Sequence, residues 1–97
     1  MLATPEVRLH VDPARKFDIP KEIAKMLRGI DGIEVNEMDG IRVTSTDGWW
    51  LLRASNTESV LSLRAEAFSE DGFDKLKSEL EGYLQKTGVD FSFDPVG

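Results

Sequence analysis

Three strand-like runs follow one another in residues 41–67, whose sequence is IRVTSTDGWWLLRASNTESVLSLRAEA. The first and the last alternate between apolar and polar residues, and the middle one, at 49–53, is rich in bulky side chains. Alternation with a period of two is typical of strands that bury one face and expose the other. Asp47-Gly48 separates the first two runs and is a strong signal for a tight hairpin turn. The pattern therefore predicts an antiparallel meander of three strands, at 41–46, 49–53 and 60–67, with a polar connection at 54–59.

The residues before this meander predict two further strands. Residues 7–11 alternate between apolar and polar side chains, and the strand is bounded by Thr4-Pro5 and Asp12-Pro13. Residues 33–37 form a short strand candidate, and Asp39-Gly40 directly after it is another hairpin signal. The meander is therefore expected to pair with additional strands on its edges.

Two amphipathic helices are also predicted. The first covers residues 19–28, with Asp18 as its N-cap and Gly29 as its C-terminal stop. The second begins after the N-cap Ser69 and ends at Gly88, and acidic residues near its start suit the positive end of a helix. Its apolar stripe consists of Phe73, Leu76, Leu80, Tyr83 and Leu84.

The order of these elements predicts an α+β fold in a single domain over residues 1–97. We expect a two-layer plate, in which an antiparallel sheet of four to five strands carries both helices on one face. The other face of the sheet is expected to be more polar. The tail at 89–97 has no clear pattern, and no element is predicted there.

Composition and charge exclude several classes of protein. The chain has 97 residues and a formal net charge of −6, which argues against a nucleic-acid binder because such proteins need a basic surface. It has no cysteine and one histidine, His10, so neither a thiolate metal site nor a histidine-rich cluster is expected. No apolar run approaches the roughly 18 residues of a membrane span, and residues 1–8 do not resemble a signal peptide. We expect a soluble cytoplasmic domain without a membrane partner.

Polar side chains with phosphate-binding chemistry follow the strand at 49–53. Arg53 presents a planar fork of donors that matches phosphate oxygens. Ser55 and Thr57 each offer a hydroxyl, Asn56 offers an amide, and turn backbone can direct N–H groups at an anion. The stretch is therefore a candidate site for one phosphate group. Ser-Asn-Thr is also good turn chemistry, and an Arg at a strand end is usually solvated or paired with a carboxylate, so both interpretations remain open.

Other polar residues give weaker indications of a functional site. Glu34, Glu37 and Asp39 lack any metal-ligand spacing, so no metal site is predicted. Arg8 and Arg15-Lys16 form a small basic cluster, which either steers an anion or has no role. His10 falls on the polar face of its strand without an identifiable catalytic partner.

The chain resembles the C-terminal domain of the α-D-phosphohexomutases, most closely the bacterial phosphomannomutase/phosphoglucomutase branch. Three stretches carry the resemblance: Thr4-Pro5-Glu6 before the first strand, residues 39–43 at the hairpin, and residues 48–64 around the polar connection. The last of these, with Arg53-Ala54-Ser55-Asn56-Thr57, is the most specific. The resemblance extends from about Thr4 to the end of the second predicted helix.

This resemblance implies a function. Members of the family are four-domain enzymes that move a phosphoryl group between the 1- and 6-positions of a hexose. The catalytic phosphoserine and the Mg²⁺ site lie in the other three domains, so the resemblance implies no catalytic residue, metal or cofactor here. The C-terminal domain has a TATA-binding-protein-like fold and binds the phosphate that is not reacting. Its partners would be the hexose phosphate and the other three domains, and the isolated domain is expected to be inactive. By position, Arg53, Ser55, Asn56 and Thr57 would be the phosphate contacts.

Three positions depart from the pattern common in the superfamily. Many members have Gly at the position of Asn56, although Asn occurs in the branch resembled here, and Pro is common where Ser59 stands. Trp50 occupies a position that is often Gly, which raises the question of how its ring is accommodated. An alternative from another class is a free-standing α+β module that binds a ligand or a protein through its open sheet face.

Overall fold

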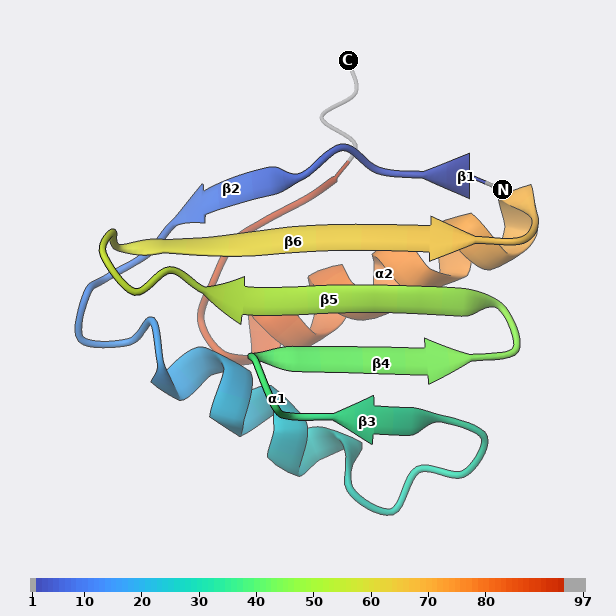
Figure 1. Cartoon of the computed structure of the whole chain (residues 1–97), viewed down its shortest axis with the longest axis horizontal. Coiled ribbons are helices and arrows are strands. Elements are labelled where there is room, and N and C mark those ends of the chain that lie inside the picture. The colour runs from blue at the N-terminus through green and yellow to red at the C-terminus, as the bar shows by residue number, and fades with distance from the viewer. Residues whose placement is uncertain (1, 94–97) are drawn as a thin grey trace.

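The computed structural model describes residues 2–93, which form six strands and two α-helices (Figure 1). In chain order, these are β1 (Leu2–Ala3), β2 (Val7–His10), α1 (Asp18–Leu27), β3 (Glu34–Asn36), β4 (Ile41–Ser45), β5 (Gly48–Ala54), β6 (Val60–Ala67) and α2 (Glu70–Lys86). The predicted strands and helices are all present, with bounds that agree to within a few residues. Of the tail 89–97, for which no element was expected, residues 94–97 lie outside the described part of the chain.

All six strands belong to one antiparallel sheet with the order β1-β6-β5-β4-β3. Strand β2 also pairs with β6, so β1 and β2 share the same outer edge. Thr4 lies between them, donates its backbone N–H to the Ala65 carbonyl at 2.9 Å and accepts from Ala65 N–H through its hydroxyl at 3.0 Å. The sheet is therefore five strands wide, as expected. The two-residue strand β1 was not predicted because it is too short to show alternation.

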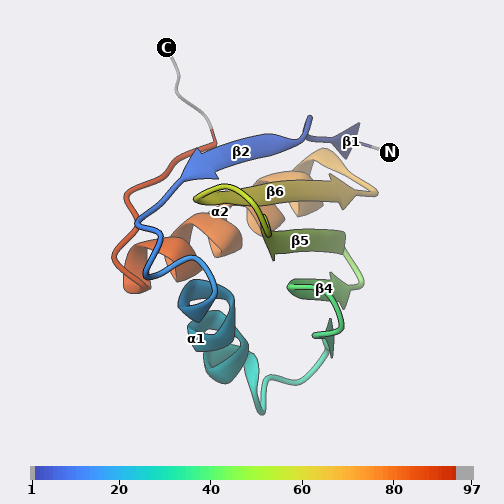
Figure 2. The same cartoon turned by 60° about the vertical axis from the view of Figure 1, so that its left-hand side comes forward.

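Both helices cover one face of the sheet, which confirms the predicted two-layer α+β fold (Figure 2). Helix α2 packs on β5 and β6, and α1 packs on β5 and α2. The core between the layers consists mainly of Ile19, Ile23, Leu27, Ile41, Trp50, Leu52, Leu61, Leu63, Leu76, Leu80 and Leu84. Each such aliphatic side chain contributes about 1.5–3 kcal/mol by leaving water.

The two tryptophans face opposite sides of the sheet, as the alternation predicts. Trp50 is fully buried, and its ring lies 6.2 Å from that of Tyr83 on α2. Its indole N–H has no hydrogen-bond partner among the described residues. Trp49 lies on the open face, where the Arg42 guanidinium stacks 4.5 Å from its ring centre. The bulky residue at the position often held by Gly is thus accommodated in the core beneath α2.

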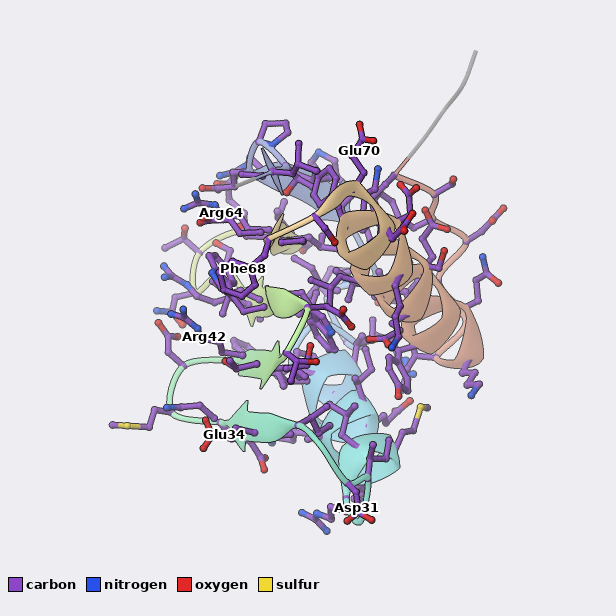
Figure 3. All side chains as sticks on the ribbon, turned by 90° about the vertical axis from the view of Figure 1, so that its right-hand side faces the viewer. Asp31, Glu34, Arg42, Arg64, Phe68 and Glu70 are labelled. Carbon is purple, nitrogen blue, oxygen red and sulfur yellow. The ribbon has the colours of Figure 1, made fainter. Side chains whose placement is uncertain are left out.

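The open face of the sheet carries mostly polar side chains, as expected. Figure 3 shows Arg42, Arg64 and Phe68 on the side away from both helices. Phe68 follows β6 directly and is an exposed aromatic side chain. The amphipathic strands thus separate an apolar layer under the helices from a charged outer surface.

The structure confirms one of the two predicted helix N-caps and contradicts the other. The prediction of Ser69 as the N-cap of α2 is confirmed, since its Oγ accepts from Gly72 N–H at 3.1 Å. The prediction of Asp18 as the N-cap of α1 is wrong, because Asp18 is the first helical residue and Phe17 occupies the cap position. The preceding turn supplies the acceptor instead: the Arg15 carbonyl accepts from the backbone N–H groups of both Asp18 and Ile19. A backbone carbonyl thus replaces the expected side-chain cap.

Neither of the two helices within residues 2–93 has the length and apolar character needed to cross a membrane.

Two glycines provide a matched test of the packing. Gly48 has φ +142°, and a Cβ there would lie 2.7 Å from the Ala67 Cα and closer still to the Glu66 carbonyl oxygen. These are backbone atoms of β6 that cannot move alone. We expect Gly48→Ala to lower the free energy of unfolding by at least about 2 kcal/mol, through backbone strain and overpacking. Gly82 of α2 has nothing within 4 Å of its Cβ position.

The control variant Gly82→Ala is therefore expected to raise the free energy of unfolding by about 0.5–1 kcal/mol, because alanine is the better helix former. Urea denaturation of both variants measures the two changes. Equal midpoints would contradict the close contact between the β4–β5 turn and β6.

Candidate functional site

The predicted site residues lie at one end of the sheet. Residues 55–59 connect β5 to β6, and we call this segment the β5–β6 loop. The antiparallel topology brings two other connections to the same end, namely the segment from β2 to α1 and the β3–β4 turn at 37–40 (Figure 1). The candidate residues therefore lie where three separate parts of the chain meet.

Ser55 organises the β5–β6 loop. Its backbone N–H donates to the Val60 carbonyl at 2.9 Å, which closes the loop at its base. Its hydroxyl oxygen accepts from the backbone N–H groups of Thr57 at 3.3 Å and Glu58 at 3.2 Å. Two N–H groups thus converge on one oxygen, as they do in backbone sites that bind anions. An oxygen atom of an oxyanion can take the place of the hydroxyl.

Arg53 lies beside the loop on the open face of the sheet. Its guanidinium lies 3.4 Å from the Asp39 carboxylate, with 55% and 75% of the two side chains exposed. Asp39 can reach it because the β3–β4 turn packs directly on β5 at Gly40, which has φ +77°. A Cβ on Gly40 would lie 2.8 Å from the Arg53 Cα. The carboxylate thus occupies part of the donor fork that an oxyanion would use.

Asn56 and Thr57 form the exposed tip of the loop. Asn56 also lines an open groove of about 320 Å³, which runs between the loop, the start of α1 and the β3–β4 turn. The other residues that line this groove are Phe17, Pro20, Lys21, Glu37, Asp39, Gly40, Ile41 and Ala54. The structure therefore brings all four predicted residues to the same end of the sheet, with the loop tip open to solvent.

The second half of the loop is held by cations from elsewhere in the chain. Arg8 of β2 forms an ion pair with the Glu58 carboxylate at 2.6 Å. Lys16, in the turn before α1, donates to the Glu58 backbone carbonyl at 2.9 Å. In the sequence, Arg8 and Lys16 stood out only as members of a small basic cluster. Asp39 was considered as part of a hairpin turn and as a metal ligand, and nothing in its local sequence indicates a contact with Arg53.

The segment that carries Lys16 is itself anchored by its neighbour Arg15. The Arg15 guanidinium forms a two-pronged pair with Glu22 of α1 and also donates to the Thr87 carbonyl at 3.2 Å. Its hydrogen bonds lower the pKa of the Glu22 carboxyl below its usual value. Arg15 therefore joins the turn before α1 to both helices and fixes the position of Lys16.

Among the described residues, no side-chain hydrogen bond or ion pair involves the remaining candidate, His10. His10 is exposed at the end of β2. Within residues 2–93, no group of three or more histidine or acidic side chains is arranged to hold a metal ion. The arrangement at the loop suits the binding of one oxyanion by a guanidinium, backbone N–H groups and hydroxyls.

Comparison with known proteins identifies the family. The family model described as phosphoglucomutase/phosphomannomutase, C-terminal domain, matches residues 6–82. The chain belongs to this family. The resemblance inferred from the sequence is thereby confirmed.

Curated relatives and a solved structure support the same family assignment. The chain is 41% identical over 78 residues to a phosphomannomutase/phosphoglucomutase of Pseudomonas putida, covering 78% of this chain and 16% of the relative. It is 34% identical over 84 residues to the protein of the same name from Pseudomonas aeruginosa, covering 87% of this chain and 18% of the relative. A phosphoglucomutase/phosphomannomutase family protein from Burkholderia thailandensis superposes with a TM-score of 0.74 and 28% identity, covering 93% of this chain and 19% of that one. The chain thus spans less than a fifth of the length of these relatives.

The role of the Ser55 hydroxyl in shaping the loop can be tested directly. We expect Ser55→Ala to leave the Thr57 and Glu58 amides without their acceptor and to cost about 0.5–1.5 kcal/mol of local stability. Hydrogen exchange of these two amides should accelerate by roughly threefold to tenfold. In the control Ser59→Ala, the same amides should exchange at the wild-type rate. Similar exchange in both variants would contradict the proposed shape of the loop.

Proposed function

We propose that this chain is the domain of a larger phosphohexomutase that binds the non-reacting phosphate of a hexose phosphate. Family membership and the greater length of the relatives support a multidomain parent. The observation that carries the proposal is local. Arg53, whose guanidinium contacts Asp39, stands two residues before a loop in which two backbone N–H groups already converge on one oxygen atom.

The chemistry of these groups matches a phosphate monoester, which carries about −1.5 to −2 charges near neutral pH. Arg53 is suited to contact two phosphate oxygens at once, while the amides of Thr57 and Glu58 donate to a third. The hydroxyls of Ser55 and Thr57 and the amide of Asn56 supply further donors. All of these groups recognise the phosphate and not the sugar, so the same site accepts either end of a hexose that must present both ends in turn.

In this proposal the domain contributes to catalysis by orientation. Holding one phosphate fixes the sugar so that its other end meets the reacting groups, which turns an encounter in solution into a reaction between aligned partners. The phosphoserine and the Mg²⁺ site belong to the other domains, and no reaction step is assigned to a metal here. The isolated chain is accordingly expected to bind phosphate without mutase activity.

The test is a titration of the 97-residue chain with glucose 1-phosphate, followed through backbone amide signals by NMR. Saturable shifts are expected from Arg53 to Glu58, with an affinity of about millimolar or weaker because one loop offers few contacts. Inorganic phosphate and mannose phosphates should produce the same shifts. Arg53→Ala should weaken binding by about 10- to 100-fold, since it removes a hydrogen bond between charged groups worth about 1.5–3 kcal/mol.

Arg64→Ala is the matched control. Arg64 is an exposed arginine on the same open face, on the neighbouring strand β6. The Arg64→Ala substitution removes one positive charge without touching the β5–β6 loop. We expect it to change phosphate affinity by less than about threefold, because salt screens distant surface charges. Equal effects of the two variants would refute a specific phosphate site at Arg53.

The contact between Asp39 and Arg53 leads to a separate prediction about phosphate affinity. Bound phosphate must displace the Asp39 carboxylate from the guanidinium. An exposed pair of this kind is worth about 0.2–1 kcal/mol, so Asp39→Asn should tighten phosphate binding by about two- to fivefold at low salt. The gain should shrink as ionic strength rises.

Glu37→Gln is the control for this second prediction, because it removes an acidic charge from the same turn without an ion pair to Arg53 among the described residues. The measurement is the phosphate affinity of both variants at low and high salt. If Glu37→Gln tightens binding as much as Asp39→Asn does, the gain is a general charge effect and the competition for Arg53 is disproved.

A further inference from the structure

The second half of the β5–β6 loop is tied down through Glu58. Its carboxylate pairs with Arg8 at 2.6 Å, and its backbone carbonyl accepts from the Lys16 ammonium at 2.9 Å. These two cations come from positions 50 and 42 residues earlier in the chain. The next residue, Ser59, accepts from the Val11 N–H at 3.0 Å. Strand β2 and the segment from β2 to α1 thus hold the loop through three contacts, two at Glu58 and one at Ser59, and Figure 2 shows this path of the chain.

The two cations reach Glu58 from differently held parts of the chain. The Arg8–Glu58 pair is a surface ion pair, with 50% and 57% of the side chains exposed, and such pairs contribute little. Lys16 is partly buried, its ammonium lies 5.0 Å from the Phe17 ring centre, and Arg15 anchors its segment to both helices. A lysine restrained in this way loses less side-chain entropy when it donates to the loop. Lys16 thus reaches Glu58 from a segment that is itself anchored to the rest of the fold.

The two cations also differ in the charge they leave at the loop. Arg8 is paired with Glu58, and Arg53 is paired with Asp39. The partner of Lys16 is a neutral carbonyl, and within residues 2–93 no carboxylate lies within 4 Å of its ammonium. An ammonium has three donors, of which the carbonyl uses one. Lys16 thus brings an uncompensated positive charge to the loop of a chain whose net charge is −6.

We infer that Lys16 is a positioning residue of the phosphate site. Its hydrogen bond to Glu58 holds the second half of the β5–β6 loop, so that the Thr57 and Glu58 amides face the phosphate. Its unpaired charge attracts the anion to that position. This inference rests on the proposed function of the loop, and it adds to the contacts implied by the family resemblance a residue from outside the Arg53–Thr57 motif.

Three substitutions of Lys16 separate the hydrogen bond from the charge. Lys16→Met removes both, Lys16→Gln keeps a donor for the Glu58 carbonyl without the charge, and Lys16→Arg keeps both. The matched control is Lys25→Met, which removes the same charge from the exposed last turn of α1. Each variant is titrated with inorganic phosphate at low and high salt, and amide exchange of Thr57 and Glu58 is measured without ligand.

Lys16→Met is expected to weaken phosphate binding by about tenfold and to accelerate exchange of the two amides, because a hydrogen bond from a charged group is lost. Lys16→Gln should keep wild-type exchange, weaken binding by a few-fold, and reduce the dependence of affinity on salt. Lys16→Arg should bind within about threefold of wild type, and Lys25→Met should match wild type in both measurements. If Lys16→Met does not fold, the comparison of Lys16→Gln with Lys16→Arg carries the test.

Two outcomes overturn the inference in distinguishable ways. If the Lys16 variants bind phosphate as Lys25→Met does while Arg53→Ala has lost binding, Lys16 has no role and the proposed function stands. If Arg53→Ala binds as wild type does, the proposed function fails and the inference fails with it.

Discussion

The pairing of β5 with β6 is the constraint on which the rest of the structure depends. Seven residue pairs, from Gly48↔Ala67 to Ala54↔Leu61, fix which side chains face the helices and which face outward. The same register places Trp50, Leu52, Leu61 and Leu63 in the core and Arg53 on the open face. A slip of one residue would exchange these two sets, because side chains alternate along a strand. The positions of the core and of the candidate site therefore both depend on this one strand pairing, which also fixes where the β5–β6 loop begins and ends.

Local charge at this loop differs from the charge of the whole chain. The net charge of −6 would repel an anion at long range, but salt screens such repulsion beyond about 8–10 Å. Arg8, Lys16 and Arg53 gather around a loop of a few residues, and two of them have carboxylate partners. The site thus combines donors that are ready for an anion with weak internal partners that an anion can displace.

Most of the fold could be predicted from the sequence, and the exceptions have physical causes. Residues 60–67 form β6 with the predicted bounds, and Ser69 caps α2, because alternation and capping act between near neighbours. Asp18 was wrongly assigned as a cap because the helix begins one residue earlier than expected, after Phe17, and the Arg15 carbonyl accepts from the first two helical N–H groups, those of Asp18 and Ile19. Strand β1 forms because it pairs with β6, to which the nearby Thr4 is also hydrogen-bonded. Its two residues are too few to show alternation in the sequence.

The sequence by itself determined the family of this protein, the alternation that makes the sheet, and the run of polar side chains from Arg53 to Thr57 for which phosphate binding is proposed. These features are contiguous in the chain, so each can be recognised where it stands. Only the tertiary structure decided that Asp39 meets Arg53 and that Arg8 and Lys16 hold Glu58 from 50 and 42 residues away. The reason is that antiparallel pairing brings three chain connections to one end of the sheet, and contacts between such distant segments leave no mark on the local sequence.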